Sequence, residues 1–482
     1  MSVPAAESPN PEAAVASSGP DAPLWSAVKE AVRGAHAHDY TQGAIGRSVI
    51  LLAIPMVLEM AMESVFAVVD VFFVSRLGAD AVATVVLTES MLTMVYTLAM
   101  GLGIGATAMV ARRIGERDAE GAAASAMQAI WLGLIVAAVL GVLGVTMAPQ
   151  LLRLMGASDA VLATGTTYMR VMLGGNVSVL MLFLINAIFR GAGDAAIAMR
   201  TLWLANLINM TLGPCLIFGV GPFPELGVTG AAVATTIGRA TGALYALTRL
   251  LRPGARIHLA TRDLRLQGDI MWRLVKLSGS GTFQIFIGTA SWILLIRIVS
   301  GFGSDVIAGY GIAIRIVIFA ILPAWGLSNA AATMVGQALG AGKPDRAEAS
   351  VWLAARYNLF FLGTLGVVFV VFAPFIVHVF SREPAIAASG IDALRVIAAG
   401  FVFYAYGMVV TQSFNGAGDT WTPTWINLAC FWCWEIPLAW FLALRTGMGA
   451  HGAYLAIAIA YATVAVVSVM LFRRGAWKTR TV

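Results

Sequence analysis

Residues Leu51–Ser75 read LLAIPMVLEMAMESVFAVVDVFFVS, an apolar run that is long enough to cross a lipid bilayer as a helix. The run nevertheless contains three acids, Glu59, Glu63 and Asp70. At about 100° per residue their side chains fall within about 40° of one another, so they form one stripe on a single helix. A carboxylate at membrane depth is costly unless it faces a cavity, a partner or an ion. We therefore interpret the stripe as functional, rather than as a set of acids that only pair with Arg inside a bundle.

The chain as a whole has the composition of a polytopic membrane protein. Of its 482 residues, 59% are hydrophobic and only 12% are charged, a balance that soluble domains do not have. We predict an all-α fold with twelve transmembrane helices. The apolar segments lie at 48–75, 82–111, 123–148, 160–189, 197–219, 227–250, 272–300, 306–336, 351–380, 389–415, 423–445 and 450–472.

The connections between these segments predict the orientation in the membrane. Lys and Arg number 22 in the tails and the alternate connections on the side of the termini, and seven on the other side. The positive-inside rule therefore places both termini in the cytoplasm. The net charge of +6 is then a topology signal and does not indicate a nucleic-acid-binding surface. Residues 1–46 are expected to form a disordered tail with a short interfacial helix within 24–37.

The two halves of the chain repeat each other. An offset of 225 residues pairs Gly78 with Gly303 and Gly101 with Gly326, and continues without a gap to the GAGD sequences at 191–194 and 416–419. Six helices per repeat predict two lobes related by an axis along the membrane normal, with a site between them. The expected units are an N-terminal lobe over 47–252, a cytoplasmic connection over 253–271, a C-terminal lobe over 272–474 and a tail over 475–482.

The repeat also shows where the halves differ. The same offset replaces each intramembrane acid of the first two helices by an uncharged residue: Glu59, Glu63, Asp70 and Glu89 become Gln284, Gly288, Leu295 and Ile314. A packing requirement would apply to both halves. The asymmetry therefore favours an ion site that belongs to the N-terminal half alone.

Several motifs resemble the multidrug and toxic compound extrusion (MATE) family, and in particular its prokaryotic DinF-like branch. They are Pro55 and Asp70 fifteen residues apart, the run from Gly105 to Gly115, Arg190-Gly-x-Gly-Asp, and Gln412-x-Phe-Asn-Gly-Ala-Gly-Asp-Thr. The resemblance covers Arg47 to about Arg474. It implies a monomeric multi-pass transporter of the inner (plasma) membrane without a cofactor. Such a transporter exports amphipathic small molecules, often cationic, in exchange for inward H⁺ or Na⁺ by alternating access.

The resemblance also implies where the coupling ion binds. Carried onto this sequence, the N-lobe cation site of that branch falls on Asp70, Asn186 and Asn209. The family pattern has an Asp four residues after the last of these, where this chain has Gly213. Either Glu63 or Glu89 is expected to replace the missing carboxylate.

The expected substrate cavity lies between the lobes and is lined mainly by aromatic, Met and polar side chains. Glu435 has two interpretations there: it forms an ion pair with Arg315, which we expect, or it receives a substrate cation. The full set of cavity candidates is Glu59, Met60, Phe66, Phe283, Gln284, Phe319, Tyr404, Tyr406, Trp434 and Glu435.

Other classes of function fit the sequence less well. No His-x-x-Glu-His arrangement or other hydrolytic set occurs, so we do not expect an enzyme. A flippase for a lipid-linked saccharide, from the same superfamily, would need a cationic cavity, whereas acids dominate the first half. A non-transporting scaffold or receptor would not need acids on one helical stripe. The sequence does not indicate the substrate, or the choice between H⁺ and Na⁺.

Overall fold

The computed structural model describes residues 24–34 and 38–482, and the expected tail over 1–23 lies outside these residues. The first half of the chain forms α1 (Leu24–Arg33), α2 (Ile45–Ser75), α3 (Ala79–Gly115), α4 (Ala119–Leu154), α5 (Asp159–Gly174), α6 (Asn176–Ala192), α7 (Ala195–Phe218) and α8 (Val228–Leu250). After a 3-10 turn, η1 (Thr261–Leu264), the second half begins with α9 (Gly268–Ser300), α10 (Ser304–Gly340), α11 (Pro344–Phe380), α12 (Pro384–Ala399) and α13 (Phe401–Gly416). It ends with α14 (Trp421–Asn427), a π-helical turn η2 (Leu428–Glu435), α15 (Ile436–Leu444), α16 (Ala450–Arg473) and a 3-10 turn η3 (Ala476–Thr479).

These helices confirm an all-α polytopic membrane protein. Within the described residues, ten spans are long and apolar enough to cross a membrane, and the bent pair α12 and α13, which meet at 53°, makes an eleventh. The one expected segment that is not among these spans is 227–250, which forms α8. Its sequence is less apolar because it contains several Thr and Gly residues and Arg239. The segment expected over 160–189 is interrupted after Gly174, where α5 ends and α6 begins.

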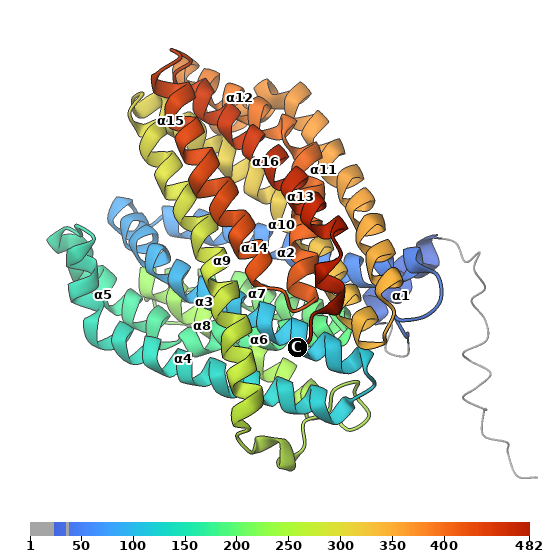
Figure 1. The fold of residues 1–482 in the computed structure, drawn as a ribbon. Coiled ribbons are helices and arrows are strands. Elements are labelled where there is room, and N and C mark those ends of the chain that lie inside the picture. The colour runs from blue at the N-terminus through green and yellow to red at the C-terminus, as the bar shows by residue number, and fades with distance from the viewer. Residues whose placement is uncertain (1–23, 35–37) are drawn as a thin grey trace, which may run out of the picture.

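The helices form two groups, which we call the N-lobe (α2–α8) and the C-lobe (α9–α16). Figure 1 shows that the lobes meet near the C-terminus and diverge toward the end that carries α5 and α15. We call the end formed by residues 38–44, the α8–α9 connection and the C-terminal tail the terminal face. Near it the hydroxyl of Thr333 donates to the carbonyl of Arg190 at 3.1 Å, and the amide of Gln337 donates to the carbonyl of Gly191 at 2.9 Å. These bonds join α10 of the C-lobe to α6 of the N-lobe.

Glycines allow α3 and α10 to approach closely at the terminal face. A Cβ atom at Gly115 would lie 2.1 Å from the carbonyl oxygen of Gln337, and one at Gly340 would lie 2.2 Å from that of Arg112. No larger residue fits these positions without a shift of backbone. Small residues at helix contacts are typical of membrane bundles, in which packing rather than exclusion of water holds the helices together.

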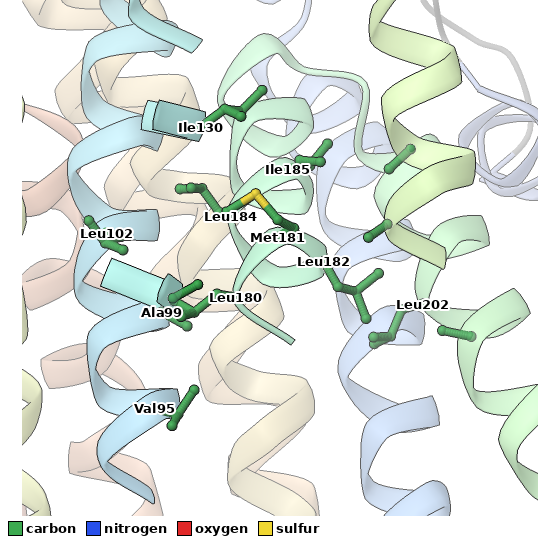
Figure 2. Packing of buried hydrophobic residues seen from close by; sticks show 14 of the residues in the cluster. Val95, Ala99, Leu102, Ile130, Leu180, Met181, Leu182, Leu184, Ile185 and Leu202 are labelled. Carbon is green, nitrogen blue, oxygen red and sulfur yellow. The ribbon is translucent and has the colours of Figure 1, made fainter. Parts of the chain in front are cut away.

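Inside the N-lobe the core lies between α3, α4, α6 and α7. Figure 2 shows Val95 and Leu102 of α3 on the side facing Leu180 and Leu184 of α6, with Ile130 of α4 close by. All five side chains are at least 95% buried. This close packing holds α6, and with it the polar residues described below, in a fixed position next to α3.

Candidate functional site

Glu59 of α2 is fully buried and is held by two side chains of α6. Nη1 of Arg190 donates to Oε1 of Glu59 at 2.7 Å, and the amide of Asn186 donates to the same oxygen at 3.0 Å. Asn186 and Arg190 are four residues apart, so both project from one face of α6. Glu59 therefore has a cation beside it, and the pair links α2 to α6.

Glu63, one turn further along α2, forms a second buried ion pair. Nη2 and Nη1 of Arg239 lie 2.6 and 3.4 Å from its two carboxylate oxygens, and the amide of Asn206 donates to it at 3.0 Å. The guanidinium also lies 5.2 and 5.3 Å from the ring centroids of Phe66 and Phe183. Because the side chain of Arg239 is 2% exposed, its charge would be buried without a contacting counterion if Glu63 were replaced by a neutral residue.

Asp70 lies two turns beyond Glu63 and differs from both other acids of the stripe. Within the described residues its half-buried side chain has neither a hydrogen bond nor an ion pair. Arg239 and Glu89 are within electrostatic range, but Arg239 is already bonded to Glu63. The carboxylate of Asp70 is thus available to bind a proton or a cation.

The two amides that were expected beside Asp70 do not contact it in this structure. Asn186 bonds to Glu59, which is eleven residues or about 16 Å along α2 from Asp70. Asn209 donates to the hydroxyl of Thr235 at 2.7 Å, and it follows Asn206 by less than a turn of α7. It therefore lies closer to the level of Glu63 than to that of Asp70. The expected three-residue cation shell is not assembled.

Of the two acids proposed to replace the missing carboxylate at Gly213, only Glu89 lacks a counterion in contact. Glu63 is neutralised by Arg239. Glu89 is exposed on α3 and lies within electrostatic range of Asp70 and of Arg315 on α10. A Cβ atom at the buried Gly213 would lie 3.7 Å from the side-chain oxygen of Asn209, an ordinary van der Waals contact, so a side chain there would start beside Asn209 without a clash.

A pocket of about 250 Å³ lies between the lobes, bounded by α2, α3 and α6 on one side and by α10 and α13 on the other. Its C-lobe wall includes a chain of amides: Asn415 donates to Gln412 at 2.9 Å, and Gln412 donates to Asn329 at 2.9 Å. Its N-lobe wall includes one member of each ion pair, Arg190 and Glu63. The N-lobe residues that line it include Met60, Glu63, Tyr96, Thr107, Phe183 and Arg190.

A second pocket, of about 390 Å³, lies mainly among the helices of the C-lobe and includes Gln284, Tyr404 and Tyr461 in its lining. The other expected cavity residues are placed elsewhere. Phe283, Phe319 and Trp434 are about half exposed outside both pockets, because neighbouring helical positions point about 100° apart. Four more also lie outside the two linings: Glu59, Phe66, Tyr406 and Glu435.

The expected ion pair between Glu435 and Arg315 is wrong. No salt bridge joins them within the described residues, and Arg315 is exposed on α10 on the side of Glu89. Glu435 is 1% exposed and faces Tyr310, Tyr404 and Tyr461 inside the C-lobe. The substrate-cation interpretation also loses its basis, because the carboxylate does not reach a pocket.

Sequence reasoning missed several residues that surround the acidic stripe of α2. Arg190 was counted with the positive charges of a loop, yet it belongs to the last turn of α6 and pairs with Glu59. Tyr96 and Tyr168 lie within electrostatic range of Asp70 and Glu89, but nothing in their sequence context separates them from core aromatics. Asn206 could have been found, because it precedes Asn209 on the same face of α7.

Comparisons with known proteins match both lobes of the chain. The model of the MatE family matches residues 55–215 and again residues 282–441, once in each lobe. A relative from Bacillus subtilis, named probable multidrug resistance protein YoeA, is 24% identical over 91% of this chain and 96% of its own length. The probable multidrug resistance protein NorM of Caulobacter vibrioides is 27% identical over 89% of this chain and 91% of its own length. A Shewanella oneidensis protein named FAD transporter is 26% identical over 72% of this chain and 77% of its own length.

Solved structures share the fold over nearly the whole length. One is described as the outward-facing conformation of a multidrug resistance MATE family transporter of the MOP superfamily; it has a TM-score of 0.85 and 25% identity, covering 92% of this chain and 98% of that one. Another is a MOP superfamily transporter from Pyrococcus furiosus, with a TM-score of 0.86, 25% identity and the same coverage.

Proposed function

Because this chain belongs to the MATE family, we propose that it is a secondary active antiporter that acts as a monomer. It exports amphipathic, cationic drugs or metabolites in exchange for an inward ion. The observation that carries the proposal is Asp70, a carboxylate inside the membrane-spanning N-lobe without a partner among the described residues. Acids in such positions mark ion pathways in transporters.

The surroundings of Asp70 favour H⁺ over Na⁺ as the coupling ion. A sodium site needs several oxygen ligands around the ion. The amides of Asn186 and Asn209 are committed to Glu59 and to Thr235. A proton needs only the carboxylate itself, so Asp70 with Glu89 nearby suffices.

The way in which the lobes meet supports alternating access. They are bonded to each other at the terminal face and diverge away from it (Figure 1). With the termini in the cytoplasm, as the charge distribution predicts, this conformation is open to the outside. Proton binding at Asp70 would then favour the conformation that takes up substrate from the inside, through one shared equilibrium.

A second candidate is the export of an anionic metabolite. It is favoured by Arg190 in the lining of the 250 Å³ pocket, and a relative bears the name FAD transporter. Against it, Arg190 is paired with Glu59 and the same lining contains Glu63, so the pocket has no excess of positive charge. The same balance weakens the flippase alternative, which needs a cationic cavity.

Transport by the purified chain in liposomes tests the proposal. A fluorescent cationic dye and an anionic dye are each loaded, and a pH gradient or a Na⁺ gradient is imposed separately. We expect the pH gradient alone to drive movement of the cationic dye. Movement driven only by the Na⁺ gradient would reject H⁺ as the coupling ion. Movement of the anionic dye alone would support the second candidate. No gradient-driven movement of either dye would reject the antiporter.

A further inference from the structure

Glu435 is a buried acid that the proposed mechanism does not use. It ends the π-helical turn η2 in the middle of the span Trp421–Leu444. The residue is 1% exposed, and its Oε2 atom is buried without a hydrogen-bond partner among the described residues. Its side chain takes part in no ion pair in the described part of the chain. Turns of this kind occur frequently at functional sites.

The groups that face Glu435 are all neutral hydrogen-bonding groups. They are the phenols of Tyr310 on α10, Tyr404 on α13 and Tyr461 on α16, and the thiol of Cys430 on η2 itself. The flanking helices α14 and α15 contain no titratable residue. The other ionisable residues of the neighbouring helices α9 and α16 that the structure describes have no electrostatic interaction with Glu435. They are Asp269, Arg273, Lys276 and Arg297 on α9, and His451, Tyr454 and Arg473 on α16.

The internal repeat shows which residue of the C-lobe occupies the position of Arg239. The offset of 222 residues that pairs Gly227 with Gly449 also pairs Arg239 with Tyr461. In the N-lobe that position supplies the guanidinium that neutralises Glu63. In the C-lobe it supplies a phenol, which can share a hydrogen bond with a carboxyl but cannot balance a charge.

A carboxylate in this environment is stable only with a proton on it, because an unpaired buried charge is strongly disfavoured. We propose that Glu435 is a second proton-binding site of this protein, located in the C-lobe and separate from Asp70. It holds one proton in the conformation described here and releases it as H⁺ when the C-lobe rearranges, so the group changes from a neutral carboxyl to a carboxylate.

The tyrosines provide a route between this site and water. Tyr404 and Tyr461 both line the 390 Å³ pocket, and both lie within electrostatic range of Glu435. Their rings stack with centroids 4.1 Å apart. Each phenol accepts and donates a hydrogen bond, so the pair can pass a proton from the pocket to the carboxyl.

Infrared spectroscopy of the full chain in lipid tests the site without requiring transport, so its result does not depend on the proposed antiport. The Asp70→Asn variant serves as the background, which removes the other candidate proton site. We expect a band from a protonated carboxyl at neutral pH, and we expect it to be absent when Glu435→Gln is added. The matched control is Asp392→Asn, an exposed acid of the C-lobe that contacts His451, and it should leave the band unchanged.

Two further variants keep the test decisive. Glu435→Asp retains a titratable group and should shift the band rather than remove it, which assigns the band even if Glu435→Gln folds poorly. Replacing both Tyr404 and Tyr461 by Phe should keep the band and slow its exchange with heavy water. Two results would overturn the proposal: a band that is the same with and without Glu435, or no carboxyl band in the Asp70→Asn background at neutral pH. An unchanged rate of exchange with heavy water in the Tyr404 and Tyr461 variant would overturn the tyrosine route.

Discussion

Glu59, Glu63 and Asp70 share one stripe of α2 but differ in the charges beside them. Glu59 and Glu63 each contact an Arg from another helix, whereas Asp70 has no partner in contact among the described residues. An acid that contacts an Arg already has a counterion, so it does not need an exchangeable ion. The arginines of α6 and α8 therefore determine which acid of the stripe is left without a contacting counterion.

Asp70→Asn removes the titratable charge and nearly preserves the shape of the side chain. We expect this variant to fold normally, because no partner of Asp70 among the described residues is left unsatisfied. We expect gradient-driven export to fall to the background of empty liposomes, measured by dye movement under an imposed pH gradient. Export at the wild-type rate would refute Asp70 as the coupling site.

Glu63→Gln leaves the guanidinium of Arg239 buried without a counterion, and should lower the free energy of unfolding by about 3–5 kcal/mol. Adding Arg239→Gln removes the second charge and should recover most of that loss. The matched control is Glu120→Gln, which breaks an exposed pair with Arg262 at 2.9 Å and should cost less than about 1 kcal/mol. Thermal unfolding in detergent compares the wild type with the three variants. Equal losses of stability for Glu63→Gln and Glu120→Gln would show that the buried pair contributes no more than an exposed one.

The stripe could be predicted from the sequence because helical periodicity is a local property. Its partners could not, since Asn186 and Arg239 lie 127 and 176 residues away from the acids that they contact. The same limit explains the wrong pairing of Glu435 with Arg315. Similar depth in the membrane says nothing about which face of a helix a side chain occupies.

At the scale of the elements, α3 and α10 determine how closely the lobes meet. Their facing glycines, Gly115 and Gly340, leave room for backbone atoms of the opposite helix. The helices and their repeat could be predicted from the sequence, because apolar length and duplication are visible without knowing which segments contact each other. The π-helical turn over Leu428–Glu435 and the helix breaks at Gly175 and Gly400 were not predicted, because these breaks lie inside apolar segments that are otherwise continuous.

Gly340→Ala places a methyl group where the carbonyl oxygen of Arg112 would be 2.2 Å away, so it should hold the lobes apart at the terminal face. The helix itself should not suffer, because Ala is the better helix former. Gly311→Ala, on the same helix with nothing within 4 Å, is the control. Distances between spin labels on the two lobes at this face, measured by double electron–electron resonance, should lengthen for Gly340→Ala only. Unchanged distances in both variants would mean that the close approach is not needed for this conformation.

At the scale of the whole molecule, the segment before α2 helps to close the terminal face. Arg346 of α11 donates to the carbonyls of Tyr40, Gln42 and Gly43 at 3.0, 2.6 and 2.8 Å. The hydroxyl of Tyr40 in turn donates to the carbonyl of Gly193 in the N-lobe at 3.1 Å. One short segment thus bonds to both lobes. A conformation that opens this face must break these contacts together with those of α3 and α10.

A disulfide across the lobes should therefore trap the molecule in the conformation described here. A Cβ atom at Gly281 of α9 would lie 3.2 Å from Cβ of Ile104 on α3, a few tenths of an ångström below the range of about 3.5–4.5 Å in disulfides, so a small separation of the two helices gives disulfide geometry. The pair Ile104→Cys and Gly281→Cys is introduced after Cys215, Cys430 and Cys433, which are free thiols, have been replaced. If transport requires the terminal face to open, oxidation should abolish dye movement under a pH gradient, and a reductant should restore it. The two single-cysteine variants should be insensitive to both treatments. Full transport by quantitatively cross-linked protein would show that the lobes do not separate there during the cycle, and alternating access by movement of the lobes would have to be abandoned.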